Sequence, residues 1–344
     1  MTEEMGKEAM FDFLYKLPEQ FEACLQMDFS WAQRLGGEYR NILVTGLGGS
    51  AIGGDVLRSY CLTRAAIPVV VNRDYRVPAF AGPDTLVFAV SYSGNTEETL
   101  SAYGELKDKG ARIIAVTTGG RLGEMARQHG YPVVEIPAGL VPRAATAYLF
   151  APTALILKEM GLLSGVRTEL EETVQVLREL RDQLKPGVAA PQNQARMIAG
   201  KLVNAIPVIW GSSCTSEIAA QRWKGQVNEN AKSPAYFNQF PELNHNEIVG
   251  FEAPEELVGR LAVVILRDEA DHERVQKRID ITKSIIDGRV KSVTEVHSTG
   301  SSFLPRLYSL IYIGDYASVY LALEYGINPT PVKIIDYLKA QMAQ

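Results

Sequence analysis

The sequence contains few of the residues on which metal centres and disulfide frameworks depend. Its 344 residues include only three cysteines and four histidines, and neither set is clustered. Cys24, Cys61 and Cys214 show none of the paired spacings of zinc sites or disulfide scaffolds. We therefore expect no metal site, and this cysteine usage is consistent with a reducing compartment.

Long apolar runs and an excess of basic charge are also missing. No apolar stretch approaches the ~20 residues that span a bilayer, and the acidic N-terminus, residues 1–5, lacks the pattern of a signal peptide. The net charge is −5, and no basic run offsets it, which argues against a nucleic-acid surface. We expect a cytoplasmic protein without membrane or nucleic-acid partners.

Apolar segments of strand length alternate with helical segments along most of the chain. A length of 344 residues favours two domains, and nearly continuous apolar strands separated by helices indicate parallel sheets covered on both faces. The candidate strands are residues 41–45, 67–71, 86–90, 112–116 and 132–136 in the first half, and residues 206–210, 261–266 and 291–296 in the second.

The two halves look like copies of one another. Residues 42–51 and 207–216 share an apolar strand, a glycine and then small and hydroxyl residues. The predicted fold is α/β, with two tandem doubly wound domains of mainly parallel strands plus N- and C-terminal helices. The expected boundaries are 1–160, a helical connection at 161–200, and 201–344. Ligands of such domains bind at the carboxyl ends of the strands.

A hydroxyl-rich turn follows the apolar run 85–90. Residues 91–99 read Ser-Tyr-Ser-Gly-Asn-Thr-Glu-Glu-Thr, at the junction of a predicted strand and a predicted helix, where backbone N–H groups and the helix dipole attract a phosphate. Asn95 and Glu98 have the spacing of a capping box. The turn lacks the lysine of a P-loop, which favours a sugar phosphate over a nucleoside triphosphate.

A glycine-rich loop, residues 46–55, follows the first predicted strand. It contains Gly-x-Gly-x-x-Ala, and Asp74 lies past the next strand, so a dinucleotide-binding site is one interpretation. The other is that the glycines let the backbone approach a sugar closely. For Gly53 and Gly54 we expect tight packing of a helix on a strand.

Four charged or titratable side chains are candidates for chemistry. Glu229 lies between two asparagines near the end of a predicted helix, His245 lies in a proline-flanked loop, and Arg143 precedes an apolar helix. On a helical wheel, Lys339 of the last helix falls at the edge of the apolar arc, so we expect it to face the body of the protein. Taken singly, each is equally compatible with an ordinary role: a solvated glutamate, a surface histidine, a structural ion pair or a lysine at the rim of the core.

Together these segments resemble the sugar isomerase (SIS) superfamily, and within it the bifunctional phosphoglucose/phosphomannose isomerases of archaea and some bacteria. The glycine loop 46–54, the turn 91–99, Asn-Glu-Asn-Ala-Lys at 228–232 and Asn-His-Asn-Glu at 244–247 look like that family's motifs in order. The combination of the last two is far more specific than the hydroxyl turn alone.

The resemblance implies a role for each candidate. Ser91, Ser93 and Thr96 would bind the phosphate. Gly49 and Ser50 would line the sugar. The resemblance also implies that Glu229 moves a proton between C1 and C2, that His245 assists ring opening with Lys339, and that Arg143 stabilises an enediolate. It implies no metal or redox cofactor, and a homodimer with shared active sites that converts glucose 6-phosphate and mannose 6-phosphate to fructose 6-phosphate.

Three other functions remain open at this stage. A non-catalytic sugar-phosphate regulator uses the same fold, although no helix-turn-helix pattern is present. An NAD(P)-dependent oxidoreductase would use the first glycine loop. An aminosugar isomerase would need an ammonia source, and the sequence has no N-terminal cysteine nucleophile for hydrolysis of glutamine.

Overall fold

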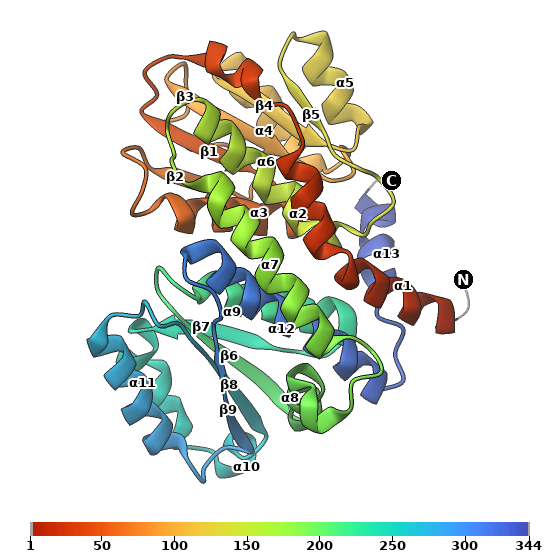
Figure 1. Ribbon diagram of the computed structural model, residues 1–344, viewed down its shortest axis with the longest axis vertical. Helices are drawn as coiled ribbons and strands as arrows, with labels where there is room; N and C mark the ends of the chain where they lie inside the picture. The colour runs from red at the N-terminus through yellow and green to blue at the C-terminus, as the bar shows by residue number, and fades with distance from the viewer. Residues whose placement is uncertain (1–2, 343–344) are drawn as a thin grey trace. The chain divides into compact units, whose positions relative to one another are not determined.

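The computed structural model describes residues 3–342, which fall into two compact units. The N-terminal unit comprises Leu17–Gln175 and Ser302–Pro305. The C-terminal unit comprises the chain up to Lys16, Val176–Ser301 and the chain from Arg306 onward. Each unit is built on one parallel sheet with helices on both faces (Figure 1), which confirms the predicted fold class.

The N-terminal unit has a five-stranded sheet in the order β2-β1-β3-β4-β5, and every neighbouring pair is parallel. Its strands are β1 (Asn41–Thr45), β2 (Val69–Asn72), β3 (Thr85–Val90), β4 (Arg112–Thr117) and β5 (Val133–Glu135). The helical segments are α2 (Leu17–Leu25), η1 (Ser30–Leu35), α3 (Gly49–Cys61), α4 (Glu97–Asp108), α5 (Gly120–Gln128), η2 (Pro142–Ala144) and α6 (Thr146–Glu159). Helix α7 (Val166–Leu184) begins in this unit and ends in the other.

Alternating strand residues divide the core of this unit between the two faces of the sheet. Leu43 and Val87 pack with Tyr103 of α4 and Leu122 of α5 on one face, while α3 covers the other. A Cβ atom on Gly54 would lie 2.8 Å from Cγ1 of Val44 on that face. The glycine therefore lets α3 lie directly on β1, as the sequence predicted.

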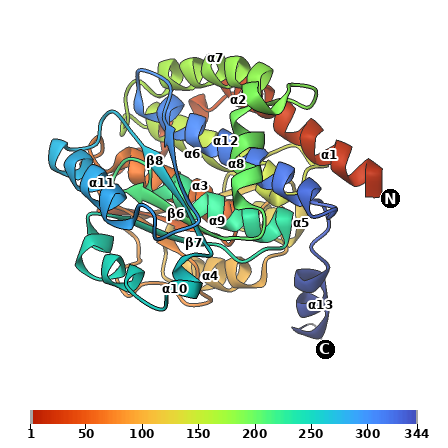
Figure 2. The same cartoon turned by 90° about the horizontal axis from the view of Figure 1, so that it is seen from below.

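The C-terminal unit repeats this arrangement with four parallel strands in the order β7-β6-β8-β9. The strands are β6 (Ile206–Ser212), β7 (Tyr236–Phe240), β8 (Leu261–Arg267) and β9 (Ser292–His297). The helical segments are α1 (Glu3–Tyr15), η3 (Ala190–Gln192), α8 (Gln194–Leu202), α9 (Glu217–Gln226), the π-helical turn η4 (Val227–Ala231), η5 (Glu242–His245), η6 (Glu247–Phe251), α10 (Glu255–Val258), α11 (Glu273–Ile286), α12 (Phe303–Glu324) and α13 (Lys333–Met342). The first three residues of α12 belong to the N-terminal unit. Helix α11 lies along one face of this sheet (Figures 1 and 2), where Ile279 packs with Trp210 and Val263.

Strand β7 was not among the predicted strands. It is an edge strand that pairs only with β6, and its first residues, Tyr236 and Phe237, are 60% and 41% exposed. Pro234 and Pro241 flank it. Its residues therefore lack the continuous apolar character by which buried parallel strands are recognised.

Helix α13 differs from its predicted environment. None of its residues is buried, and Ile334 is 85% exposed, so the expectation that the edge carrying Lys339 faces the body of the protein is wrong for this chain. In Figure 2 the helix follows a connecting segment after α12 and lies at the C-terminal end of the trace. Among the helices that the structure describes, none combines the length and apolar character needed to cross a membrane.

Candidate active site

The hydroxyl turn connects β3 to α4 and is organised by its own side chains. Ser91 Oγ and Thr96 Oγ1 lie 2.9 Å apart, Ser91 Oγ accepts a hydrogen bond from Gly94 N at 3.1 Å, and Ser93 Oγ accepts one from Asn95 N at 3.2 Å. Ser91 is buried, whereas Ser93 is exposed. The turn follows β3 at the β1/β3 switch point, the position at which sheets of this strand order bind ligands.

A second loop, between β4 and α5, supports this turn. Gly94 has a φ of +69°, and a Cβ atom there would collide with the carbonyl of Gly119. The expected capping box is absent: Thr96 is the N-cap of α4 and makes no side-chain capping hydrogen bond. Asn95 Oδ1 instead accepts a hydrogen bond from Arg121 N at 3.1 Å, so its side chain caps the first turn of α5 rather than that of α4.

The glycine loop and Arg143 lie against each other in the same unit. A Cβ atom on Gly49 would lie 2.8 Å from the carbonyl oxygen of Pro142 and 3.3 Å from Arg143 N. Arg143 is 4% exposed, and its turn is held by Gln20 Nε2, which donates to the carbonyl of Ala144 at 2.9 Å. Only glycine permits this close approach at position 49, so the sequence at this position shapes the site.

Ser50 connects the glycine loop to the hydroxyl turn. Ser50 is buried, and its Oγ accepts a hydrogen bond from Tyr92 N at 3.4 Å. The structure thus gathers the six residues predicted for phosphate, sugar and enediolate within the N-terminal unit: Gly49, Ser50, Ser91, Ser93, Thr96 and Arg143.

Tyr92 was missed as a site residue by the sequence reasoning. Its hydroxyl donates to the carbonyl of Pro137 at 3.0 Å and accepts from Leu140 N at 2.9 Å, so it fixes the segment that leads to Arg143. Burial raises the pKa of Tyr92, and the hydroxyl therefore keeps the proton it donates. The only signal in the sequence was a large aromatic residue between two serines.

Glu229 lies in the π-helical turn η4 that continues α9. The turn is fixed to α12 by Asn230 Nδ2, which donates to Ser318 Oγ at 2.9 Å. One turn earlier, Gln226 Nε2 donates to Asp315 Oδ1 at 2.9 Å. Single π-helical turns inside α-helices are frequent at functional sites. Here the turn leaves Asn230 buried against α12 and Glu229 half-buried at its edge.

A buried ion pair anchors α9 below this turn. Arg222 Nε and Nη2 donate to the two carboxylate oxygens of Asp315 at 3.0 and 2.8 Å, and both side chains are almost wholly buried. Burial raises the pKa of Asp315, and the Arg222 guanidinium opposes that increase. The pair fixes the register of α9 against α12, and with it the position of Glu229.

A cavity of about 740 Å³ within the C-terminal unit is lined by Glu229. Its other lining residues come from η4 and the residues directly after it, from the connection between α12 and α13, and from the first turn of α13: Asn228, Lys232, Ser233, Pro234, Gly326, Ile327, Asn328, Pro331, Val332, Lys333, Ile334 and Ile335. The cavity therefore places open space beside the predicted base.

His245 and Lys339 are not among the residues that line this cavity. Both side chains are exposed. The amides beside the histidine bond elsewhere: Asn244 Nδ2 donates to Thr282 Oγ1, and Asn246 Nδ2 donates to Glu242 Oε1. Within residues 3–342, no group of three or more His, Cys, Asp or Glu side chains is arranged to hold a metal ion.

The strand order argues against the dinucleotide interpretation of the glycine loop. The usual dinucleotide-binding sheet has the order 3-2-1-4-5-6, whereas this sheet has the order 2-1-3-4-5. Asp74, the candidate ribose ligand, accepts a hydrogen bond from Arg76 N at 3.1 Å in a local turn. Neither feature supports a nicotinamide site.

Two doubly wound units with a hydroxyl turn at the β1/β3 switch point define an SIS-type protein. The sequence model of the SIS domain matches residues 38–154, and that of the bacterial phospho-glucose isomerase C-terminal SIS domain matches residues 191–342. The structure of a hypothetical protein from Thermus thermophilus is similar over 99% of this chain and 94% of that one, with a TM-score of 0.73 and 15% identity, which supports the fold alone.

Similarity to named proteins identifies the family within this class. A bifunctional phosphoglucose/phosphomannose isomerase of Caldicellulosiruptor bescii is 51% identical over 97% of this chain and 99% of its own. One of Aquifex aeolicus is 37% identical over 88% of this chain and 91% of its own. The chain belongs to the family of bifunctional phosphoglucose/phosphomannose isomerases.

Proposed function

We propose that this chain catalyses the reversible aldose–ketose isomerisation of glucose 6-phosphate and mannose 6-phosphate to fructose 6-phosphate. Its relatives of 51% and 37% identity, which it matches over nearly their full lengths, are named for the phosphoglucose and phosphomannose activities. The observation that carries the proposal is the grouping of Ser91, Ser93 and Thr96 beside Gly49, Ser50 and Arg143.

The proposed phosphate anchor is the hydroxyl turn. Ser91, Ser93 and Thr96 supply short hydroxyl donors, and the N-terminus of α4 begins directly after them at Glu97. A helix N-terminus favours an anion through its unpaired N–H groups and its dipole. The sugar would extend from this anchor along Gly49 and Ser50.

The proposed chemistry is a proton transfer between neighbouring carbons. His245, with Lys339, moves a proton between the ring oxygen and O1, which opens the ring and frees the C1 carbonyl. Glu229 removes the C2 proton to give a cis-enediolate whose negative charge lies on O1. The hydroxyl proton of O2 passes to O1, and the same carboxyl returns its proton to C1, so that C2 becomes the carbonyl carbon. Arg143 stabilises the negative oxygen of the intermediate. No redox cofactor takes part, because the hydrogen moves as a proton within one substrate.

Glucose 6-phosphate and mannose 6-phosphate differ in configuration at C2. One base can therefore serve both sugars only if it can approach either face of that carbon. Rotation about the C2–C3 bond achieves this if the sugar has room near the carbonyl end. Gly48, Gly49 and Ser50 are small residues in the predicted sugar-lining loop, which supports a pocket of that kind. We therefore propose one base, Glu229, for both sugars.

The direct test is to incubate the purified protein with each aldose phosphate and to measure fructose 6-phosphate. A Glu229→Gln variant should lose ~10²–10⁴-fold in kcat for both sugars, because a positioned base contributes that much. Glu256→Gln, an exposed carboxylate on α10, is the control and should leave kcat unchanged. Binding of both sugars without conversion would instead indicate a sugar-phosphate regulator.

The ring-opening role has a separate test. His245→Ala should reduce turnover of the cyclic sugars more than turnover of an open-chain substrate analogue, because only the cyclic forms need the ring to open. An equal loss for both substrates would remove His245 from that step.

We also propose a homodimer in which the histidine loop of one protomer completes the site of the other. The exposure of His245, outside the cavity beside Glu229, supports this, as does the uncovered apolar surface of α13. Refolding Glu229→Gln and His245→Ala chains together should restore about one quarter of the wild-type activity, since half of the dimers then carry one intact site. No recovery would rule out shared sites.

The remaining expectations are proposals of the same kind. By role, residues 1–160 form the phosphate-binding part, residues 161–200 a helical connection and residues 201–344 the part that carries the base. We place the enzyme in the cytoplasm, in carbohydrate metabolism, where it serves glycolysis or gluconeogenesis without nucleic-acid or membrane partners. Cell fractionation and the sugar-phosphate content of a deletion strain test these points.

A further inference from the structure

Each unit has its own switch point, at the equivalent place in its sheet. In the N-terminal unit it lies between β1 and β3, and in the C-terminal unit the equivalent strands are β6 and β8, because the orders β2-β1-β3-β4 and β7-β6-β8-β9 correspond strand by strand. Ligands of doubly wound sheets bind at this point, outside the carboxyl ends of the strands. The duplicated fold therefore contains a second position that is built to hold a ligand.

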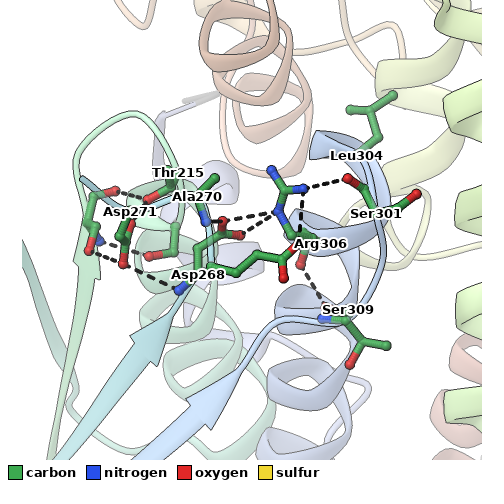
Figure 3. Close-up of polar contacts among 12 residues, drawn as sticks. Thr215, Asp268, Ala270, Asp271, Ser301, Leu304, Arg306 and Ser309 are labelled. Atoms are coloured by element: carbon green, nitrogen blue, oxygen red, sulfur yellow. Dashed lines mark hydrogen bonds and ion pairs between the residues drawn. The ribbon is translucent and has the colours of Figure 1, made fainter. Parts of the chain in front are cut away.

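A side chain of the protein occupies that second position (Figure 3). Ser212 Oγ, at the end of β6, donates to Asp271 Oδ2 at 3.0 Å, and Thr215 Oγ1 donates to Asp271 Oδ1 at 2.5 Å. The backbone N–H of Asp268, directly after β8, also donates to Asp271 Oδ2, at 3.3 Å. Two hydroxyls and one backbone N–H thus converge on one carboxylate, the arrangement expected around a bound anion.

Most of the site is buried. Ser212 is 1% exposed and Asp271 is 6% exposed, whereas Thr215 is half-buried. A buried donor without an acceptor is destabilising, so the hydroxyl of Ser212 and the N–H of Asp268 require an acceptor at this place. Asp271 supplies it from the loop that follows β8, the loop equivalent to the hydroxyl turn of the other unit.

The negative charge beside this carboxylate is balanced separately. Asp268 accepts hydrogen bonds from Arg306 Nε at 3.1 and 3.2 Å, and Arg306 Nη1 also donates to the carbonyl of Ser301 at 2.8 Å (Figure 3). Both charged side chains of this pair are largely buried. A cation is therefore already present next to the pocket, but it is paired with the buried Asp268 and, at 3.7 Å, with the exposed Glu269.

The corresponding turn of the N-terminal unit has the opposite character. Residues 91–96 carry hydroxyl and amide groups and no carboxylate, whereas residues 268–271 carry Asp268, Glu269 and Asp271. The first turn can donate to an external phosphate. In the second, the acceptor is part of the chain.

We propose that Asp271 is the built-in occupant of an anion pocket at the β6/β8 switch point, so that each chain takes up one phosphate group rather than two. The carboxylate stands where the duplicated fold would hold an external anion and satisfies the donors of Ser212 and Thr215. Removing this side chain opens the pocket to inorganic phosphate.

Phosphate binding to the full-length protein tests the proposal. We expect calorimetric titration with orthophosphate to give one site per wild-type chain and two sites per chain in Asp271→Ala, the second of millimolar affinity because the anion must shed water. Asp271→Asn, which fills the pocket with an amide, is the control and should bind one. Adding Thr215→Val to Asp271→Ala should weaken the second site at least 10-fold. Asp271→Ser, which introduces a small hydroxyl that can accept a hydrogen bond, replaces Asp271→Ala if that variant does not fold.

A second variant tests the role of Arg306. In Asp271→Ala with Asp268→Asn, the guanidinium loses its buried partner and keeps only the exposed Glu269, at 3.7 Å, so the second phosphate should bind at least 10-fold more tightly. Three results would overturn the proposal. They are two phosphates on the wild-type chain, a single phosphate on folded Asp271→Ala and on folded Asp271→Ser, or electron density for the second phosphate in an Asp271→Ala crystal that lies away from Ser212 and Thr215. None of these readouts depends on isomerase activity.

Discussion

Lys232, which lines the cavity beside Glu229, donates a hydrogen bond from Nζ to the carbonyl oxygen of Pro329 at 3.0 Å. The same ammonium group donates to the carbonyl of Glu229 itself. Lys232 ends the π-helical turn with a φ of +54°, a left-handed conformation that is uncommon for a residue with a side chain. One side chain thus joins the turn that carries the proposed base to the segment that leads to α13.

Replacing Lys232 by methionine should release this segment while preserving the apolar part of the side chain. We expect kcat to fall roughly 10- to 100-fold with little change in KM, because small displacements of a base cost rates of that order while the phosphate anchor is untouched. Amide hydrogen exchange of residues 326–335 should become faster. Steady-state kinetics and exchange mass spectrometry measure the two effects.

Lys333→Met is the matched control for that variant. Lys333 lines the same cavity and is exposed, so its loss should change neither kcat nor exchange by more than about twofold. Lys232→Gly separates backbone strain from hydrogen bonding, since glycine accepts the positive φ but lacks the ammonium group. Unchanged exchange in Lys232→Met would show that the segment is held by other contacts.

Tyr92→Phe should weaken the site without altering its shape. The change deletes only the hydroxyl that bridges Pro137 and Leu140. The loss of two hydrogen bonds, each worth about 0.5–1.5 kcal/mol, corresponds to a decrease of at most roughly 5- to 150-fold in kcat/KM. Tyr75→Phe is the control, because the Tyr75 hydroxyl makes an exposed contact to Glu97 at 3.4 Å. A fall in thermal stability with no change in kcat/KM would mean that the bridge supports the fold alone.

Arg222→Met should strongly destabilise the C-terminal unit. It leaves the buried Asp315 carboxylate without its bidentate partner, and breaking a buried pair in this way costs about 3–5 kcal/mol. Urea denaturation measures the change. Arg40→Met, which breaks an exposed pair with Asp84, should cost no more than about 1 kcal/mol. Combining Arg222→Met with Asp315→Leu should recover much of the loss, and a double variant no more stable than Arg222→Met would contradict this account.

Asp271 should make stability depend on pH. Burial raises the pKa of Asp271, and this outweighs the hydrogen bonds from Thr215 and Ser212, which lower it. The folded chain then binds the proton more tightly than the unfolded chain, so the contribution of Asp271 to the free energy of unfolding falls as pH rises from about 3.9 through the folded pKa.

Asp271→Asn removes this titration. The free energy of unfolding of Asp271→Asn minus that of the wild type should increase with pH in this window, by at most about 1.4 kcal/mol per unit, and become constant above it. Urea titrations at intervals between pH 3.5 and 7 measure the difference. A difference that decreases with rising pH would show that the hydrogen bonds outweigh burial.

Much of the fold could be predicted because buried parallel strands are continuous apolar runs. Residues 41–45 and 206–210 were recognised in this way, and the structure gives β1 and β6 at those positions. The edge strand β7 escaped because only one of its five side chains is buried, and the capping box failed because Asn95 bonds to the first turn of α5. Local patterns therefore predicted elements well where burial dictates residue type, and poorly where another helix competes for a side chain.

By itself, the sequence determined the α/β class, the duplication and the identity of the hydroxyl turn, since these depend on strand periodicity and on residue types that adjoin in the chain. Only the tertiary structure decided that Gly49 presses against Pro142, that Lys232 joins Glu229 to Pro329, and that Asp271 fills the second switch point. Each of these contacts joins residues far apart in the sequence or depends on the direction of a side chain, and the free energy that selects it comes from burial and hydrogen bonding in the folded chain.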